Sequence, residues 1–74
     1  MDKVSQRRKI MAYMREHGSI TPKDAEKLFR CMRLASRIDE LRNKEGHKEI
    51  LTVMESYIDE DGTRVRYARY VIAE

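Results

Sequence analysis

The sequence predicts a small α+β domain in which three helices precede a β-hairpin. An apolar stripe recurs at helical spacing over residues 34–41. The segment TPKD at residues 21–24 has the composition of a helix start. Two runs rich in β-branched and aromatic residues, 49–58 and 63–72, flank a polar turn, which is typical of a hairpin. Together these patterns place the helices first and the paired strands last.

The first predicted helix spans about residues 5–17. Ile10 and Met14 fall on one helical stripe, while most charged residues of the segment lie off it. We expect Ser5 to cap the start by accepting a hydrogen bond from a free backbone N–H. Gly18 follows the last helical residue, where a left-handed conformation ends many helices.

The second predicted helix spans about residues 22–30 and carries the clearest local signal in the chain. Thr21 suits the N-cap, Pro22 suits the first helical position, and Asp24 stands where the acid of a capping box belongs. Its apolar residues are expected to face inward, namely Ala25, Leu28 and Phe29.

The third predicted helix spans about residues 33–45 and ends at Gly46. Its inward stripe is expected to contain Leu34, Ile38 and Leu41. Only a few residues around Cys31 separate it from the second helix. Two helices joined so tightly must cross at a steep angle, which predicts a helix-turn-helix with a buried, small Cys31 in the turn.

The extended segments complete the predicted fold. Residues 19–20 are too short for a helix and suit a small third strand, and the hairpin spans about residues 48–72. Asp61 and Gly62 form a strong turn dipeptide, because glycine accepts the positive φ that such turns require. We expect four methionines to fill the core: Met11, Met14, Met32 and Met54.

Length and composition limit what the chain can do. Seventy-four residues fit a single domain over residues 1–74 with one small core. The single cysteine, Cys31, leaves no internal disulfide, and no Cys/His group has metal-ligand spacing, so we expect neither a metal nor another cofactor. No apolar run has the length of a signal peptide or of a bilayer span, so a cytoplasmic protein without membrane contact is expected.

The chain resembles small winged helix-turn-helix proteins of phages and prophages. The resemblance rests on GSITP at residues 18–22, on CMRLASRIDELR at residues 31–42 and on EGH at residues 45–47, and it extends over about residues 5–72. It implies a three-helix bundle with a two-stranded wing, and DNA binding with the third helix as the reader. Arg30 departs from the pattern, because many relatives are expected to have glycine at this turn position.

The charge distribution supports a polyanionic partner. Residues 1–44 contain twelve Lys and Arg against six Asp and Glu, whereas residues 45–74 contain four against seven. On the third helix, the residues expected opposite the apolar stripe are Arg33, Ser36, Arg37, Glu40 and Lys44. Arg33, Ser36 and Arg37 lead as base contacts, because they lie toward the N-terminal end of the helix. The alternative is a solvated face that only keeps the domain soluble.

Further basic residues are candidates for contacts with phosphates. In the first two helices these are Arg7, Arg8, Thr21, Lys23 and Lys27. Arg64 and Arg66 share one face of the second hairpin strand, since strand side chains alternate, and Arg69 adds a further charge. For these wing arginines, ion pairing with Glu49 or Glu55 is the alternative. The acidic tip of Asp59, Glu60 and Asp61 should be repelled by phosphates, so we expect it to point away from DNA or to serve a protein partner.

The leading functional hypothesis is a non-enzymatic protein that binds double-stranded DNA in a bacterial host. The resemblance suggests a phage or prophage transcriptional regulator or recombination accessory factor. A protein-interaction winged helix that binds a host protein is the alternative, because the fold alone does not fix the partner. No nucleophile, metal set or phosphate loop is visible, so an enzyme is not expected. A monomer or weak homodimer is expected.

Overall fold

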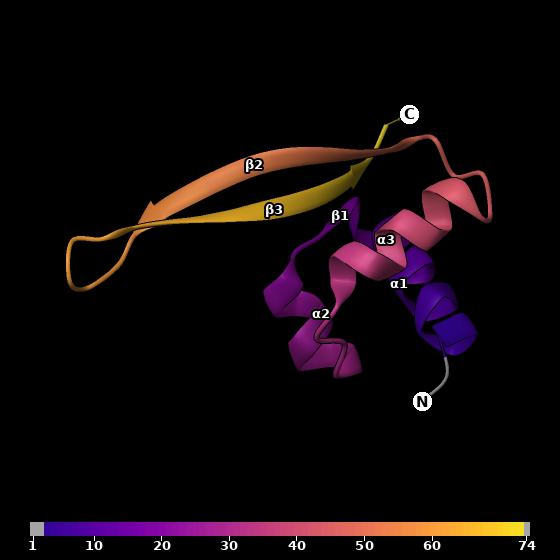
Figure 1. The fold of residues 1–74 in the computed structure, drawn as a ribbon, viewed down its shortest axis with the longest axis horizontal. Helices are drawn as coiled ribbons and strands as arrows, with labels where there is room; N and C mark the ends of the chain where they lie inside the picture. Colours follow the sequence, from indigo (N-terminus) through magenta and orange to yellow (C-terminus); the bar gives the residue numbers. More distant parts are fainter. Residues whose placement is uncertain (1–2, 74) are drawn as a thin grey trace.

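The computed structural model describes residues 3–73 and, over that range, has an α+β architecture with three helices and one antiparallel sheet of three strands (Figure 1). The elements are α1 (Lys3–His17), β1 (Ser19–Ile20), α2 (Pro22–Phe29), α3 (Leu34–Asn43), β2 (Ile50–Ile58) and β3 (Arg64–Ile72). The predicted fold class and order of elements are therefore confirmed.

The helix ends differ from the predicted ones by a few residues. α1 already includes Lys3, so Ser5 lies inside the helix and is not its N-cap. α2 ends at Phe29 because Arg30 adopts the left-handed conformation, with φ 52° and ψ 32°. Gly18 also has positive φ, 87°, as predicted for the residue that ends α1. α3 is shorter than predicted and covers Leu34–Asn43.

The sheet has the order β1-β3-β2, which leaves β2 at an edge. Ile20 pairs with Tyr70 and thereby joins the connection between α1 and α2 to the hairpin. In the hairpin, Ile50 faces Ile72 at the base and Ile58 faces Arg64 near the tip. Residues 19–20 thus form the predicted third strand.

The core lies between the helices and the base of the hairpin. The largest fully buried side chains are Ile10, Met14, Ile20, Ile38 and Leu41. Ala25 and Cys31 are also buried, whereas Leu28 is 51% exposed, so its predicted inward orientation is wrong. Met32 and Met54 are exposed as well, and the core therefore uses only part of the predicted methionine set.

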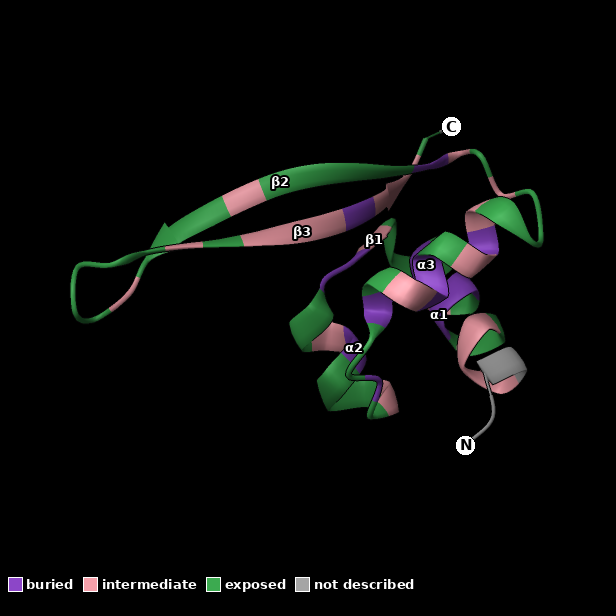
Figure 2. Cartoon of the chain, in the orientation of Figure 1, coloured by how far each residue is buried: buried purple, intermediate pink, exposed green. Residues whose placement is uncertain are grey.

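The hairpin is much longer than the core beneath it. It runs across the helices and projects beyond them, and burial is concentrated at its base (Figures 1 and 2). Ile50 and Tyr70 are buried there, while Met54 and Ile58 toward the tip are exposed. The molecule measures 39 × 28 × 21 Å in consequence. Among the described residues, no helix has the length and apolar character to cross a membrane.

Candidate nucleic-acid interface

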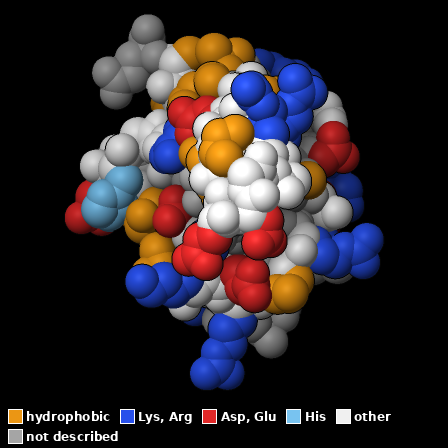
Figure 3. Space-filling model, turned by 90° about the vertical axis from the view of Figure 1, so that its left-hand side faces the viewer, with side chains coloured by type: hydrophobic (Ala, Val, Ile, Leu, Met, Phe, Trp, Pro, Cys, Tyr) orange, Lys and Arg blue, Asp and Glu red, His pale blue; other side chains and the backbone are white. Residues whose placement is uncertain are grey.

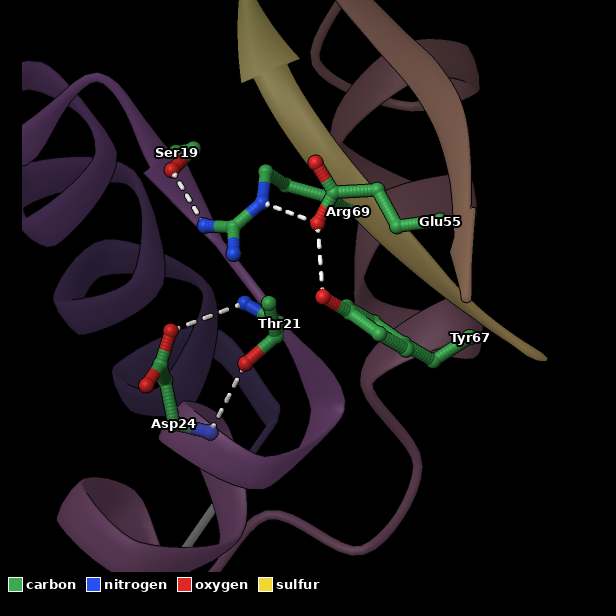
Figure 4. Close-up of polar contacts among 6 residues, drawn as sticks. All are labelled: Ser19, Thr21, Asp24, Glu55, Tyr67 and Arg69. Atoms are coloured by element: carbon green, nitrogen blue, oxygen red, sulfur yellow. Dashed lines mark hydrogen bonds and ion pairs between the residues drawn. The ribbon is translucent and has the colours of Figure 1, made fainter. Parts of the chain in front are cut away.

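The start of α2 is fixed by a complete capping box, as the sequence predicts. The Thr21 hydroxyl oxygen accepts a hydrogen bond from the Asp24 backbone N–H at 3.2 Å, and the Thr21 N–H donates to an Asp24 carboxylate oxygen at 3.1 Å (Figure 4). Pro22 occupies the first turn, where its missing N–H leaves no donor unsatisfied. These contacts set the direction in which α2 leaves the sheet.

The turn between α2 and α3 is short and hydrogen-bonded. The N–H of Arg30 donates to the carbonyl of Glu26 at 3.0 Å, and the N–H of Cys31 donates to the carbonyl of Ala25 at 3.1 Å. The Cys31 side chain is only 3% exposed, so the turn is anchored in the core as predicted. Arg33 follows as the N-cap of α3, and its side chain is exposed at the start of that helix.

α3 buries one face and leaves the other uncovered. The buried residues of the helix are Leu34, Arg37, Ile38 and Leu41. The exposed residues at and after its start include Arg33, Ala35, Asp39, Asn43 and Lys44. Ser36 is half-buried. The helix is thus held on its apolar side and open on the opposite side.

Arg37 and Glu40 do not stand on the open face, and the predicted placement of these two residues is wrong. Arg37 is only 7% exposed, and its Nε lies 3.0 Å from Glu40 Oε1. The same Glu40 oxygen lies 3.3 Å from Nη1 of Arg7 on α1, and Arg7 Nε lies 2.7 Å from Glu45 Oε2. These charged groups form one network that ties α1 to α3.

Electrostatics within this network favour the charged forms. The hydrogen bond with Glu45 raises the pKa of Arg7, outweighing the opposing effect of its desolvation. Desolvation acts to raise the pKa of Glu40, but the Arg7 hydrogen bond and the charge of Arg37 together lower it. Arg7 is therefore paired with Glu40 and Glu45 within the domain, and its expected contact with a phosphate stays a prediction.

The five predicted residues of α3 nevertheless line one polar groove beside α1. These residues are Arg33, Ser36, Arg37, Glu40 and Lys44. Arg33 and Lys44 are exposed, whereas the paired Arg37 and Glu40 are largely covered. The exposed face of α3 is therefore turned about the helix axis, relative to the predicted face, by roughly 100°, which is the angle between successive residues at 3.6 residues per turn. The groove thus contains all five predicted residues, but only some of them are exposed to solvent.

The rotation adds residues that sequence reasoning missed. Ala35, Asp39 and Asn43 are exposed on α3. Asn43 donates to the Asp39 carboxylate at 2.8 Å and accepts from Lys48 at 3.2 Å. The spacing of Asp39 and Asn43, four residues apart on a helix, is the sequence signal that could have indicated a shared face.

The predicted phosphate contacts outside α3 fall into two groups. Arg8, Lys23 and Lys27 are exposed, as a phosphate contact requires. Thr21 is only 7% exposed, and its N–H and hydroxyl oxygen are both engaged in the capping box. Thr21 therefore serves the start of α2, while the three basic side chains remain available.

On the wing, the basic residues have two different roles. Arg64 and Arg66 are exposed and share one sheet face, as predicted. Arg69 is on the other face and pairs with Glu55, which is the alternative that the sequence analysis left open. Glu55 Oε1 accepts hydrogen bonds from Arg69 Nε at 2.8 Å and from the Tyr67 hydroxyl at 2.8 Å (Figure 4). Arg69 also donates to the Ser19 hydroxyl at 3.0 Å. This cluster connects all three strands.

The pKa values of this cluster follow from the same contacts. Hydrogen bonds from Arg69 and then Tyr67 lower the pKa of Glu55, and the hydrogen bond to Glu55 raises the pKa of Arg69. Glu49, the other predicted partner, pairs with His47 instead, with 2.9 Å between His47 Nδ1 and Glu49 Oε1. Its own backbone N–H and then His47 lower the pKa of Glu49.

Arg42 links α3 to the hairpin in a way the sequence did not reveal. Its Nε donates to the carbonyl of Ile50 at 3.0 Å, and its Nη2 donates to the Thr52 hydroxyl at 2.6 Å. Its guanidinium also lies 5.8 Å from the centre of the Tyr70 ring. The helix and the wing are therefore held in a defined relative orientation.

One of the acidic residues at the hairpin tip stabilises the turn itself. One Asp59 carboxylate oxygen accepts hydrogen bonds from the N–H groups of Asp61 and Thr63, each at 2.9 Å. Figure 3 views the molecule from the side on which the hairpin projects, and acidic side chains gather near the middle of this face with Lys and Arg around them. The tip therefore presents negative charge at the far end of the wing.

The helix-turn-helix of α2 and α3, followed by a two-stranded wing, defines a winged helix-turn-helix. Comparison with protein families agrees, since the model of the winged helix-turn-helix domain family matches residues 5–74. The chain belongs to this family. In the comparison with curated proteins nothing matches the chain. The family suggests DNA binding.

Proposed function

We propose that the chain binds double-stranded DNA by placing the open face of α3 in the major groove. The observation that carries this proposal is the arrangement of α3, whose apolar side is fixed in the core while its other side is uncovered and begins with the exposed Arg33. A major groove admits a helix of this kind, and its N-terminal residues normally reach the base edges.

The polar side chains on and beside this face suit different contacts. Arg33 can donate two hydrogen bonds to guanine O6 and N7, and Ser36 can contact a base or a phosphate. Asp39 can accept from the amino group of cytosine, while Lys44 can neutralise a phosphate. Arg37 and Glu40 act indirectly in this proposal, by holding α3 against α1.

Exposed cations on both sides of α3 complete the proposed footprint. On α2 these are Lys23 and Lys27, and on the wing they are Arg64 and Arg66. Contacts from these side chains to phosphates would orient the domain without reading sequence. We further propose that the chain acts in a bacterial cytoplasm as a phage or prophage regulator or recombination accessory factor. The resemblance of the α1–α2 junction and α3 to such proteins supports this role.

Fluorescence anisotropy with a mixed-sequence duplex tests the proposal. Four neutralised phosphates would give a log–log salt slope of about −3.6, so affinity should fall roughly 100-fold between about 50 and 200 mM salt. Arg33→Ala should weaken binding, whereas Arg15→Ala removes the same charge from an exposed position in the last turn of α1 and should have little effect. Absence of binding at tens of micromolar protein in low salt, or equal losses in both variants, would refute it.

A second candidate function, protein binding, is favoured by the apolar residues exposed on the hairpin. Leu51, Met54, Tyr57 and Ile58 are each about half exposed or more. Because side chains alternate along a strand, Leu51, Val53 and Tyr57 share one face of the sheet, and exposed apolar side chains grouped in this way commonly mark a protein contact.

A further inference from the structure

Two exposed apolar side chains of β2 share one face of the hairpin with two exposed arginines of β3. Met54 is 64% exposed and Ile58 is 60% exposed. The strand register sets Ile58 directly opposite Arg64, and Ser56 directly opposite Arg66. Opposite residues project from the same side of a sheet, and side chains alternate along a strand, so these residues lie on one face. We refer to Met54, Ile58, Arg64 and Arg66 as the wing flank.

The wing flank belongs to the side of the sheet that rests on α3. Arg42 of α3 donates to the Thr52 hydroxyl at 2.6 Å, and its guanidinium lies 5.8 Å from the centre of the Tyr70 ring. Thr52 and Tyr70 face each other across the two strands, and even numbers of residues separate them from the residues of the flank. The flank therefore projects from the α3 side of the hairpin, and its far end, where β2 finishes, extends past the helices (Figure 1).

The arginines give the wing flank the charge of a nucleic-acid contact. Both side chains are exposed, and within residues 3–73 neither Arg64 nor Arg66 is held by a carboxylate, unlike Arg69 on the other face, which pairs with Glu55. Proteins that bind the minor groove of DNA commonly combine arginine with an inserted apolar side chain such as Ile or Met. The wing flank has both kinds of side chain, so its chemistry fits a minor groove.

The reach of the hairpin matches the spacing of the DNA grooves. Ile58 lies six residues beyond Thr52 on β2, which at about 3.4 Å per residue places it roughly 20 Å from the contact with Arg42. One turn of B-DNA is about 34 Å long, so a minor groove is centred about 17 Å along the axis from the centre of a major groove. When α3 occupies a major groove, the far end of the wing flank therefore lies at the next minor groove.

The acidic tip determines how the wing can approach the phosphates. The Asp59 carboxylate is turned back into the loop, where it accepts hydrogen bonds from the N–H groups of Asp61 and Thr63. Glu60 and Asp61 are exposed at the end of the hairpin. Entry of the tip itself would bring these carboxylates between the phosphates, which is unfavourable. An approach by the flank instead uses the arginines and leaves the tip outside the groove.

We propose that the wing flank lies in the minor groove beside α3, and that Ile58 inserts between two base pairs and bends the duplex. Such insertion partly unstacks one base step and kinks DNA by about 20–90° toward the major groove. Arg64 and Arg66 hold the phosphates that border the groove, while Met54 contacts the sugars nearer to α3. This inference rests on the proposed function, because it requires α3 in the adjacent major groove.

Energy transfer between dyes at the two ends of a short duplex tests the bend. The probe is a duplex of about 20 base pairs with one TA step at its centre, because this step is easily kinked. A kink of about 60° at the centre shortens the distance between the ends from about 68 to about 59 Å, so saturating wild-type protein should raise the efficiency of energy transfer. Ile58→Ser should abolish the rise, whereas Ile58→Leu keeps an apolar side chain for insertion and should retain it.

Val53→Ser is the matched control. Val53 is an exposed β-branched residue of the same strand, but it projects from the opposite face, so this variant should bend the probe like the wild type. Circular dichroism reports the fold of each variant, and anisotropy confirms that the probe is saturated. A bound but unbent duplex with the wild type, or an equal bend with wild type and Ile58→Ser, would overturn the insertion and leave the proposed function in place. Absence of any duplex binding would overturn both.

Discussion

Replacing Arg30 by glycine should stabilise the domain, because this residue holds a left-handed conformation with φ 52° and ψ 32°. A side chain in that region costs roughly 1–2 kcal/mol, from the contact of its Cβ with the following carbonyl. Glycine removes the contact but loses about 0.5–1 kcal/mol more backbone entropy on folding. The expected net gain is about 0.5–1 kcal/mol.

Thermal unfolding followed by circular dichroism measures this gain. For a domain of this size it corresponds to a rise in Tm of about 2–8 °C. Arg30→Ala is the matched control, since alanine removes the exposed side chain but keeps the strained Cβ, and its Tm should stay within about 3 °C of wild type. A Tm for Arg30→Gly at or below that of Arg30→Ala would refute the reasoning.

Gly18 provides the converse test. Its φ is 87°, and a Cβ built there meets no atom within 4 Å. Gly18→Ala therefore introduces backbone strain without a clash, and it should destabilise the domain by about 1 kcal/mol. A neutral Gly18→Ala would show that positive φ carries little cost at the helix ends of this protein.

Three further predictions follow from the contacts of the capping box, the paired carboxylates and the tip. Thr21→Ala should cost about 1 kcal/mol in urea unfolding, and Thr21→Ser should restore most of it. Three carboxylates have lowered pKa values: Glu40, Glu49 and Glu55. The stabilisation that these ionised carboxylates contribute is complete above their ordinary pKa of 4.5 and is lost as the pH falls through their lowered pKa values in the folded protein. The urea midpoint should therefore fall as the pH drops below about 4.5. The fall should be less steep in Glu55→Gln, which lacks one of the three groups. Asp59→Ala should cost about 1 kcal/mol by removing the acceptor of two turn N–H groups, whereas Glu60→Ala should be neutral in dilute protein.

Local signals in the sequence were sufficient to predict the order of helices and strands. The capping box at Thr21, the apolar stripe of α3 and the turn before Gly62 each act over a few residues, and each is confirmed. These signals agree with one another, which is why the order of elements could be predicted from them. The misplaced Leu28 shows the limit, because a residue near a helix end packs only if another element covers it.

The site was harder to predict because its covered residues are charged. Arg37 follows Leu34 by three residues, a spacing that places it on the buried side, but a charged residue is usually expected in solvent. Its burial depends on Glu40, which is itself held by Arg7 from α1. A contact between residues more than thirty positions apart has no signature in local periodicity. The same holds for the clamp formed by Arg42 on the hairpin.

Exchanging Arg37 for methionine separates a buried positioning role from direct base contact. Methionine retains the length and apolar stem that pack beneath α3, and Glu40 keeps its contact with Arg7. DNA affinity should therefore stay within about twofold of wild type, while Arg33→Ala at the exposed start of α3 should cost about 1–3 kcal/mol on a preferred site. The comparison uses anisotropy on such a site, well below the Tm of each variant. A loss in Arg37→Met equal to that in Arg33→Ala, with the fold intact, would mean that Arg37 leaves its pocket to reach DNA.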